Sequence, residues 1–426
     1  MIEDNLIILL FAFAATAVVQ YALVRQRVAS IADPLLFFVL TSSFSLALGC
    51  LVVDDSWLLT RIFIYFACFY AGCLLVTGPS QRPFPPLQMH GDIQHFRVIV
   101  IVCSLVYLGF NTVMWMKSGL ILLADDPSLQ KSEAYADGFG LIRRYNWSVG
   151  VFVMIASLYW WLWERTTLAV LFLMLSVLIT ITGGGKGALL PAIFAVGLFI
   201  ANPFVSAQLH NDAPRLRRII PVLLGFTLIP VAIVLLAEQG SVKGALDAFV
   251  VRLFYFGDVL LYWGQETVRS EFTELGPVDY LRDTFGSVLG ALRLTDYGIP
   301  IGNQFVRSTL PVGADFPESL GPNLPFYVRG ELYLGAVFAP LHAFIIGVIF
   351  GYLRRLFVIY RGHSLLTYSL LSFAVVLSLT LPTEEGLAVG QAFDFVIFFL
   401  PIYALTSYFR TSIRRVTVAH SMSEER

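Results

Sequence analysis

A run of glycines followed by a lysine is the first segment whose residue types could do chemistry. It reads Thr182-Gly183-Gly184-Gly185-Lys186-Gly187. Consecutive glycines let the backbone turn sharply, so that successive N–H groups can point at one anion, and the lysine adds a positive charge. The run is not a Walker A loop, because Thr180 stands where that motif needs its first glycine. We interpret it as an anion site, and the alternative is a tight turn whose lysine reaches the membrane surface.

A second candidate lies in Ala245–Glu266, for which we predict one amphipathic helix. At about 100° per residue its polar side chains share one stripe. They are Arg252, Tyr255, Asp258, Tyr262 and Glu266. Arg252 suits a phosphate, and Asp258 in a half-dry setting can have a raised pKa and act as a base. The alternative is a solvated stripe on a helix at the membrane surface.

The third candidate is a group of polar residues that opens an apolar run. Arg329, Glu331 and Tyr333 stand within five residues, and the chain then stays apolar as far as Tyr352. Ionisable groups that enter a membrane are costly, so they mark functional sites by default. The alternative is that both charges anchor the helix at the interface.

The remaining polar residues of the apolar runs allow two weaker predictions. His342 has no second ligand at the helical spacing of a metal pair, so we predict an interhelical hydrogen bond, no metal site and no cofactor. Arg143 and Arg144 precede another apolar run. Arg143 could bind an anion, or both arginines could tie down the preceding loop through Glu133 or Asp137.

Apolar helices must position these residues, because the chain is 57% hydrophobic and 13% charged. Soluble globular chains carry about 25% charged residues, so the composition of this chain excludes the class of soluble globular proteins. We count about eleven runs that are long enough to span a bilayer. They are 5–24, 35–53, 57–77, 97–116, 147–163, 166–182, 186–201, 218–237, 331–352, 365–381 and 392–409. The predicted fold is an all-α polytopic membrane protein.

Every second short connecting loop is rich in arginine, and the short loops between them are acidic or neutral. This alternation predicts the topology. By the positive-inside rule, the N-terminus lies outside and the C-terminus in the cytoplasm. The hydrophilic segment 238–330 then faces the exterior, between the membrane segments 1–237 and 331–426. Its repeated prolines and glycines favour an ordered lid with short helices. The net charge of −1 gives no indication of a nucleic-acid partner.

Two motifs in this arrangement resemble motifs of the bacterial oligosaccharide repeat-unit polymerases, which form the Wzy or O-antigen polymerase family. That family often has Thr-Gly-Ser-Arg-Gly at a central break, where this chain has an extra residue and Lys186. The family also often has Gly-Glu-Leu-Tyr-x-Asn-Phe-Gly after its long loop. This chain has Gly330-Glu331-Leu332-Tyr333-Leu334-Gly335, which is two residues shorter. The resemblance covers the topology of the whole chain but only these two motifs in residues.

The resemblance implies an inner-membrane glycosyltransferase of the GT-C type. It would join repeat units carried on undecaprenyl pyrophosphate, without a metal, and a chain-length regulator could be its partner. Exterior cations near lipid could hold the departing pyrophosphate with the glycine run. They are Lys186, Arg252, Arg143 and Arg329. Asp258 or Glu331 could remove the proton of the acceptor hydroxyl.

Two other functions remain open. An O-antigen ligase would share this topology and chemistry, but such ligases tend to have a histidine in the long loop, and residues 238–330 contain none. A flippase or transporter would be expected to show matching broken helices in two halves, whereas only one half here has a glycine break and a long loop. The length of the surface glycan in a deletion strain would discriminate a polymerase from the other two.

Overall fold

The computed structural model describes most of the chain, which divides into two compact units. The described residues are 5–28, 30–77, 93–124, 130, 134, 139–183, 190–202, 231–233, 235–236, 239–296, 298–311, 321–360 and 364–424, with side chains described as far as 410. Unit 1 comprises Met1–Pro86, Ile193–Tyr360 and Ala374–Gly390. Unit 2 comprises Leu87–Ala192, Arg361–Phe373 and Gln391–Arg426.

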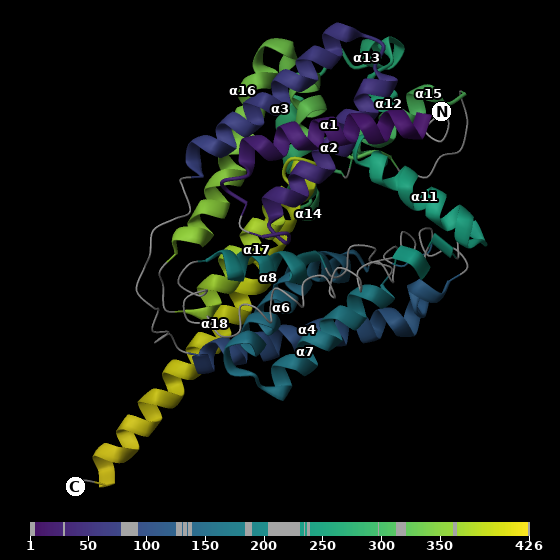
Figure 1. Ribbon diagram of the computed structural model, residues 1–426. Coiled ribbons are helices and arrows are strands. Elements are labelled where there is room, and N and C mark those ends of the chain that lie inside the picture. Colours follow the sequence, from purple (N-terminus) through teal and green to yellow (C-terminus); the bar gives the residue numbers. More distant parts are fainter. Residues whose placement is uncertain are drawn as a thin grey trace. The chain divides into compact units, whose positions relative to one another are not determined.

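Helices and turns make up all of the described secondary structure, as the predicted all-α class requires (Figure 1). Unit 1 contains α1 (Leu6–Val24), α2 (Pro34–Val52), α3 (Ser56–Val76), α11 (Val242–Phe254), η3 (Tyr255–Gly257), α12 (Leu260–Trp263), α13 (Glu266–Glu271), α14 (Pro277–Ala291), α15 (Ile301–Thr309) and α16 (Phe326–Ile359). Unit 2 contains α4 (Ile93–Ser118), η2 (Ile121–Leu123), α6 (Gly140–Glu164) and α7 (Thr167–Thr182). The units share α8 (Leu190–Ala201), α17 (Leu365–Ser378) and α18 (Glu385–Glu424).

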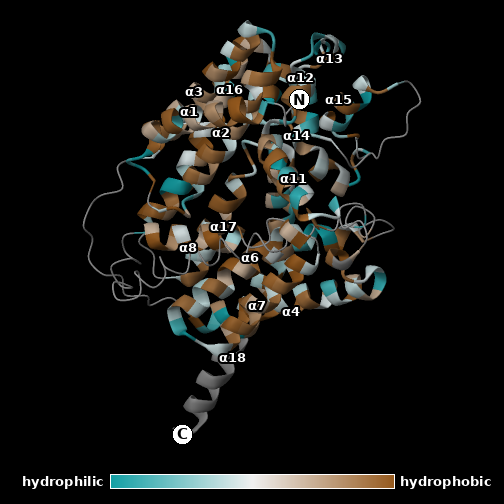
Figure 2. Ribbon diagram, turned by 45° about the vertical axis from the view of Figure 1, so that its right-hand side comes forward, coloured by the Kyte–Doolittle hydropathy of each residue, from teal (hydrophilic) through white to brown (hydrophobic). Residues whose placement is uncertain are grey.

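Six of these helices are long and apolar enough to cross a bilayer. They are α1, α2, α3, α4, α16 and the part of α18 over Glu385–Arg410. Three shorter apolar helices, α7, α8 and α17, also fall on predicted runs. Hydrophobic residues dominate the ribbons of the long helices in Figure 2. The chain is therefore built as a multi-pass membrane protein. The total of about eleven spans stays a prediction, because run 218–237 lies largely outside the described residues.

Local sequence signals explain where the first long helices begin. Asp33 caps α2, accepting a hydrogen bond from the N–H of Leu35 at 3.0 Å, and Pro34 follows at the first helical position. Asp55 caps α3 and accepts from the N–H groups of Trp57 and Leu58 at 2.9 and 3.1 Å. Each carboxylate satisfies backbone donors that have no partner inside the helix and lies at the positive end of the helix dipole.

Helices α3 and α16 form the centre of unit 1, and small residues let their backbones approach closely. A Cβ at Gly72 would lie 2.2 Å from the carbonyl oxygen of Phe344. A Cβ at Gly347 would lie 2.0 Å from the carbonyl oxygen of Phe69. Such close approach is a common device for packing helices in membranes, where hydrophobicity alone does not hold helices together. Aromatic side chains, including Phe350, fill the remaining space.

The predicted single helix over 245–266 is wrong, because α11 ends at Phe254. The chain then tightens into the 3₁₀ turn η3, and only the short helix α12 follows. A tertiary contact with α2 explains the break. The hydroxyl of Ser45 donates to the carbonyl oxygen of Phe256 at 2.8 Å, and a Cβ at Gly257 would lie 2.7 Å from Cα of Ser45. The predicted polar stripe is therefore divided between different elements.

Helix α16 is also broken, at Gly335. The backbone there has φ 72° and ψ 166°, a conformation that favours glycine. Residues 326–334 form a short helix, and the chain folds back into the long part of α16. A Cβ at Gly330 would lie 3.3 Å from Cα of Ala339, which places the two parts side by side. The sequence predicted continuous apolar helix here, so the fold-back at Gly335 is a feature that only the structure reveals.

In unit 2, α4 and α6 pack side by side. Asn111 and Asn146 exchange amide hydrogen bonds between these helices at 3.0 and 2.9 Å. The guanidinium of Arg97 on α4 binds Glu164 near the other end of α6, with a distance of 2.8 Å from its Nε to the carboxylate. Paired polar groups of this kind fix the register of two apolar helices.

Candidate functional site

The short helix over 326–334 carries the polar residues of the site on three different faces. Residues 326–330 are all buried. Tyr327 points toward Ser45 and Asp258, Arg329 toward α14 and α18, and Glu331 toward α3. Positions two apart lie on different faces of a helix, so these contacts follow from the helical geometry.

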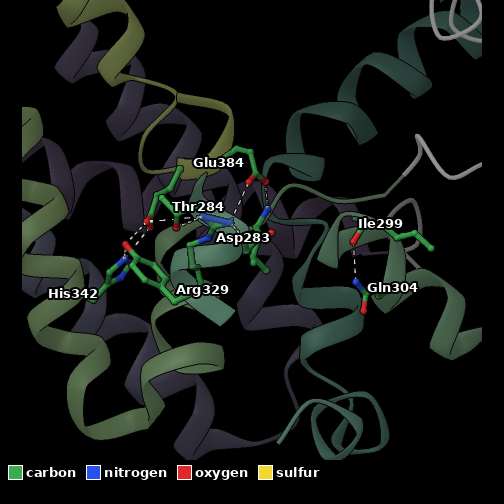
Figure 3. Close-up of polar contacts among 10 residues, drawn as sticks. Asp283, Thr284, Ile299, Gln304, Arg329, His342 and Glu384 are labelled. Atoms are coloured by element: carbon green, nitrogen blue, oxygen red, sulfur yellow. Dashed lines mark hydrogen bonds and ion pairs between the residues drawn. The ribbon is translucent and has the colours of Figure 1, made fainter. Parts of the chain in front are cut away.

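Arg329 is the centre of a group of charges in unit 1. Its side chain is 1% exposed and binds the carboxylate of Asp283 on α14. The carboxylate of Glu384 lies 3.5 Å from its guanidinium, and the hydroxyl of Thr284 lies at 3.4 Å. Figure 3 shows these side chains gathered around Arg329. A buried guanidinium needs such partners, because an unpaired charge would be too costly to desolvate.

A second set of contacts extends this group to the long part of α16. Glu385, the first residue of α18, lies 4.0 Å from the guanidinium of Arg329 and 2.9 Å from Nε2 of His342. The hydroxyl of Tyr280 on α14 donates to the other carboxylate oxygen of Glu385 at 2.7 Å and lies 3.4 Å from Nε2 of His342. The predicted interhelical contact of His342 is confirmed. Gly330 makes room for it, since a Cβ there would lie 2.9 Å from Nδ1.

These residues together form what we call the Arg329 cluster. Its members are Tyr280, Asp283, Thr284, Arg329, His342, Glu384 and Glu385. The side chains of Arg329 and Glu385 are buried, whereas those of Asp283 and Glu384 are 26% and 24% exposed. Three carboxyl groups therefore face one guanidinium and one imidazole, and two of the three are accessible at the rim. The cluster can accept protons or hydroxyl donors from outside.

The pKa of Glu384 supports such a role. Burial raises it to about 7, against the opposing effects of Arg329 and of the Leu324 N–H, which donates to this carboxylate at 2.8 Å. A carboxyl group with a pKa near neutrality can exchange a proton under ordinary conditions, which is what general acid–base catalysis requires.

In the described part of the chain, no group of three or more His, Cys, Asp and Glu side chains is arranged to hold a metal ion.

Glu331 lies outside the Arg329 cluster. One of its carboxylate oxygens accepts from Nη2 of Arg61 at 2.7 Å, and the other accepts from the hydroxyl of Tyr65 at 2.9 Å. Both partners come from α3, so this pair fastens the short helix to the centre of unit 1. The engagement of both oxygens suits a positioning residue better than a base, because a base needs an oxygen open to the substrate.

Asp258 lies on another side of the short helix. Burial raises its pKa to about 7, and the backbone N–H of Val259 partly opposes the shift. The nearby ionisable groups are the tyrosines Tyr262 and Tyr327. The prediction that Asp258 can have a raised pKa is thus consistent with its surroundings, whereas its predicted place on one stripe with Arg252 is not retained.

The other predicted site residues are distributed over both units. Tyr333 is buried beside the Arg329 cluster, with its ring centroid 5.9 Å from that of Tyr280. Arg252 is half-buried on α11. Arg143 belongs to unit 2 and stacks on Trp147 at 4.1 Å. Lys186, with Gly184 and Gly185, lies outside the described residues.

Apart from Arg329, the six residues of the Arg329 cluster were not predicted as site residues, and His342 was predicted only to make an interhelical hydrogen bond. In the sequence, Asp283 and Tyr280 are two of many charged and aromatic residues in the segment 238–330, and Glu384 and Glu385 lie between two apolar runs. The available signal was the adjacent pair Glu384–Glu385 immediately before an apolar run, together with His342 inside another. Ionisable groups in those positions are functional candidates by default.

Contacts within the cluster also bear on topology. Since α14, the short helix of α16 and the start of α18 touch one another, these segments lie on the same side of any bilayer that the long helices cross. The alternation of arginines predicts the same grouping. Which side of the membrane this is stays a prediction.

The chain matches no protein-family model, no curated protein and no solved structure. The geometry of the site and the motifs of the sequence are therefore the basis for a functional interpretation.

Proposed function

We propose that this chain is a membrane glycosyltransferase that joins oligosaccharide repeat units carried on undecaprenyl pyrophosphate. The observation that carries the proposal is the Arg329 cluster. It places Glu384, with a pKa of about 7, at the accessible rim of a buried group of charges beside membrane-spanning helices. Transfer to a sugar hydroxyl needs such a base, and a lipid-linked donor needs it at the membrane boundary.

In the proposed reaction, Glu384 takes the proton of the acceptor hydroxyl. The hydroxyl oxygen bonds to the anomeric carbon of the donor sugar, and the bond from that carbon to the pyrophosphate oxygen breaks. The bonding pair leaves with the lipid pyrophosphate. A single displacement would invert the anomeric centre. Asp283, the other accessible carboxyl, would accept a hydrogen bond from a neighbouring hydroxyl of the acceptor sugar.

Arg329 has a different role in this proposal from the one its sequence position implied. Its guanidinium is enclosed by carboxylates, so it holds Asp283 and Glu384 in place instead of binding pyrophosphate. The cation of unit 1 proposed for the leaving group is Arg252, whereas the assignment of Lys186 and Arg143 to the leaving group stays a prediction from the sequence. Removing one such positioned charge donor costs about 10²–10³ in rate.

Asp258 is the second candidate for the base, because its pKa is also raised to about 7. The two candidates differ in their surroundings. Glu384 belongs to a group of carboxyl and hydroxyl side chains that suits a sugar, whereas Asp258 adjoins the tyrosines Tyr262 and Tyr327. We propose Glu384 first for this reason. Glu331 is proposed as a positioning residue through Arg61 and Tyr65.

The two sequence motifs support the same reaction, since the glycine run and Gly330–Gly335 resemble those of repeat-unit polymerases. The proposed location is the bacterial inner membrane, with the site on the exterior face, the N-terminus outside and the C-terminus in the cytoplasm. A chain-length regulator is a possible protein partner of such an enzyme. The lipid-linked oligosaccharide is the proposed substrate, and no cofactor is proposed.

The length of the surface glycan tests this function in cells. A strain that lacks the gene should carry single repeat units, and the wild-type gene should restore the polymer. Lys186→Ala and Glu384→Gln should each fail to restore it although the protein reaches the membrane. Arg282→Gln, at an exposed position of α14, is the matched control and should restore it. Wild-type chain lengths in the deletion strain would contradict any role in glycan assembly.

One observation favours a second function, which is transport of the lipid-linked oligosaccharide. Helix α16 is interrupted at Gly335, and the buried Arg329 and His342 lie on either side of the break. Broken helices with ionisable residues are typical of transporter sites. Loss of all surface glycan in the deletion strain would favour transport or ligation, whereas single repeat units favour polymerisation.

A further inference from the structure

The Arg329 cluster exposes only one kind of charged group. The side chains of Arg329 and His342 are 1% and 5% exposed, so neither basic group of the cluster is accessible. The accessible side chains are those of Asp283 and Glu384. Figure 3 shows these two carboxyl groups together on one side of Arg329, with His342 on the other side. A ligand that reaches the cluster therefore meets carboxyl oxygens first.

The two accessible carboxyl groups still have acceptor positions for a ligand. A carboxylate offers about four such positions on its two oxygens. At Glu384, Oε2 accepts from the N–H of Leu324 at 2.8 Å, and Oε1 faces the guanidinium of Arg329 at 3.5 Å. Asp283 binds the same guanidinium through Oδ2. When they are ionised, both groups can accept hydrogen bonds from hydroxyl or ammonium groups, but neither can donate one to an anion.

The other charged residues of α14 do not offset the negative charge of these carboxyl groups. Asp279 stands one turn before Asp283 on the same side of the helix and is also half-buried. Arg282 is exposed and forms no hydrogen bond or ion pair with any residue that the structure describes. An anionic group placed against Asp283 and Glu384 would therefore meet like charges, which strongly disfavour binding.

We propose that the Arg329 cluster selects an acceptor sugar by charge. It takes a sugar that presents hydroxyl or ammonium groups to Asp283 and Glu384, and it rejects a sugar that presents a carboxylate or a phosphate there. The inference rests on the proposed glycosyl transfer and names the class of its acceptor. The half-buried ring of Tyr280, three positions before Asp283 on α14, supplies an apolar surface for the sugar.

This selection has a consequence for the repeat unit and for the donor. The sugar that carries the accepting hydroxyl would be neutral or basic next to that hydroxyl, and uronic acids would stand at other positions of the repeat unit. The pyrophosphate of the donor needs the opposite environment, because it is bound by cations. The cluster would therefore bind the acceptor, and the pyrophosphate would be bound outside the cluster.

Binding of three methyl glucosides that differ only at C6 tests the proposal. C6 carries a hydroxyl group in the first, carries an ammonium group in the second and is a carboxylate in the third. Their dissociation constants for the full chain in nanodiscs are measured by saturation-transfer NMR at pH 8, where Glu384 is ionised. The nanodiscs contain only zwitterionic lipid, so that the bilayer attracts none of the three sugars by charge, and empty nanodiscs give the background.

The carboxylate sugar should bind about tenfold more weakly than the hydroxyl sugar, and the ammonium sugar should bind more tightly than both. A unit charge about 4 Å from another changes affinity about fivefold in water and by a larger factor near a protein surface. Equal binding of the carboxylate and hydroxyl sugars would overturn the proposal, and so would the absence of binding by all three.

Substitutions at the two carboxyl groups locate the preference. Asp283→Asn and Glu384→Gln should each reduce the ratio of the carboxylate to the hydroxyl dissociation constant by about fivefold. Asp296→Asn, at an exposed position beyond the end of α14, is the matched control and should leave the ratio unchanged. A wild-type ratio in both Asp283→Asn and Glu384→Gln would overturn the proposal, because the preference would then arise elsewhere.

These binding measurements need no transfer reaction, so the two proposals can fail separately. If lipid-linked repeat units lengthen but the three sugars bind equally, the selection by charge is wrong and the proposed function stands. If the sugars bind in the expected order but no repeat unit lengthens, the proposed function is wrong and the cluster is a site for neutral and basic sugars.

Discussion

Replacing Arg329 by methionine should strongly destabilise unit 1, because three carboxyl groups would lose their shared cation. Glu384 and Glu385 lie 3.5 and 4.0 Å from the guanidinium. At an effective dielectric constant of about 20, each pair attracts by about 4–5 kcal/mol. The cost of desolvating the charges offsets much of this attraction, but breaking a buried ion pair by removing one partner typically costs about 3–5 kcal/mol. We expect a loss in that range for Arg329→Met.

The loss of stability in Arg329→Met should depend on pH. The titration of Glu384 determines whether this loss grows or shrinks as the pH rises. Arg329 is the largest influence that lowers the pKa of Glu384, which burial raises to about 7. Without the guanidinium this pKa rises further above its value in the unfolded chain. A carboxyl group with a raised folded pKa supports stability at pH values below its unfolded pKa, and that support is lost as pH rises through the folded pKa. The variant should therefore be weakest near pH 8 and recover toward pH 5.

Thermal unfolding followed with a thiol-reactive fluorophore measures this effect once Cys50, Cys68 and Cys103 have been replaced by alanine, since Cys73 of unit 1 is buried and becomes reactive when the helices separate. Arg282→Met is the matched control. It removes an exposed arginine from α14 and should change stability by no more than about 0.5 kcal/mol. If Arg329→Met melts like the wild type at pH 8, or if its deficit is the same at pH 5, the cluster is not the ionic centre of unit 1.

Three further predictions concern single residues of the site. Glu384→Gln should lower the transfer rate by about 10²–10⁴, and the wild-type rate should rise with pH through about 7, as measured with a lipid-linked repeat unit; an unchanged rate would exclude Glu384 as the base. His342→Ala should lower the melting temperature by an amount that corresponds to about 1–3 kcal/mol, because Glu385 loses a neighbour at 2.9 Å, and His342→Gln should restore part of it. Gly335→Ala should cost about 1–3 kcal/mol in the same assay, because its φ of 72° strains a residue with a Cβ, and a neutral result would show that the fold-back relaxes easily.

Hydropathy was sufficient to locate the long helices, because apolar runs of spanning length have few alternatives in a membrane. α2 and α3 begin at the capping residues Asp33 and Asp55, as the sequence signals require. The break between α11 and α12 could not be predicted in the same way. It depends on the contact of Gly257 with Ser45, which stands more than two hundred positions away in the sequence.

The site was predictable only in part, for a related reason. Arg329 and Glu331 were noticed because charges at the start of an apolar run are unusual. Their partners come from α14, α18 and α3, and no periodicity within one segment indicates such pairings. The sequence also suggested Arg329 as an anion ligand, whereas Asp283 and Glu384 enclose it in the structure. A charge pattern identifies the residues that need partners, but the tertiary fold decides which partners they find.

Incubating the purified protein in nanodiscs with an undecaprenyl-pyrophosphate-linked repeat unit tests the central proposal most directly. Gel separation of the products should show a ladder of lengthening glycans and release of undecaprenyl pyrophosphate. Glu384→Gln should give no ladder, although its melting temperature at pH 8 equals or exceeds that of the wild type. Lipid-linked repeat units recovered unchanged from the folded wild-type protein would contradict the assignment of glycosyl transfer to this site.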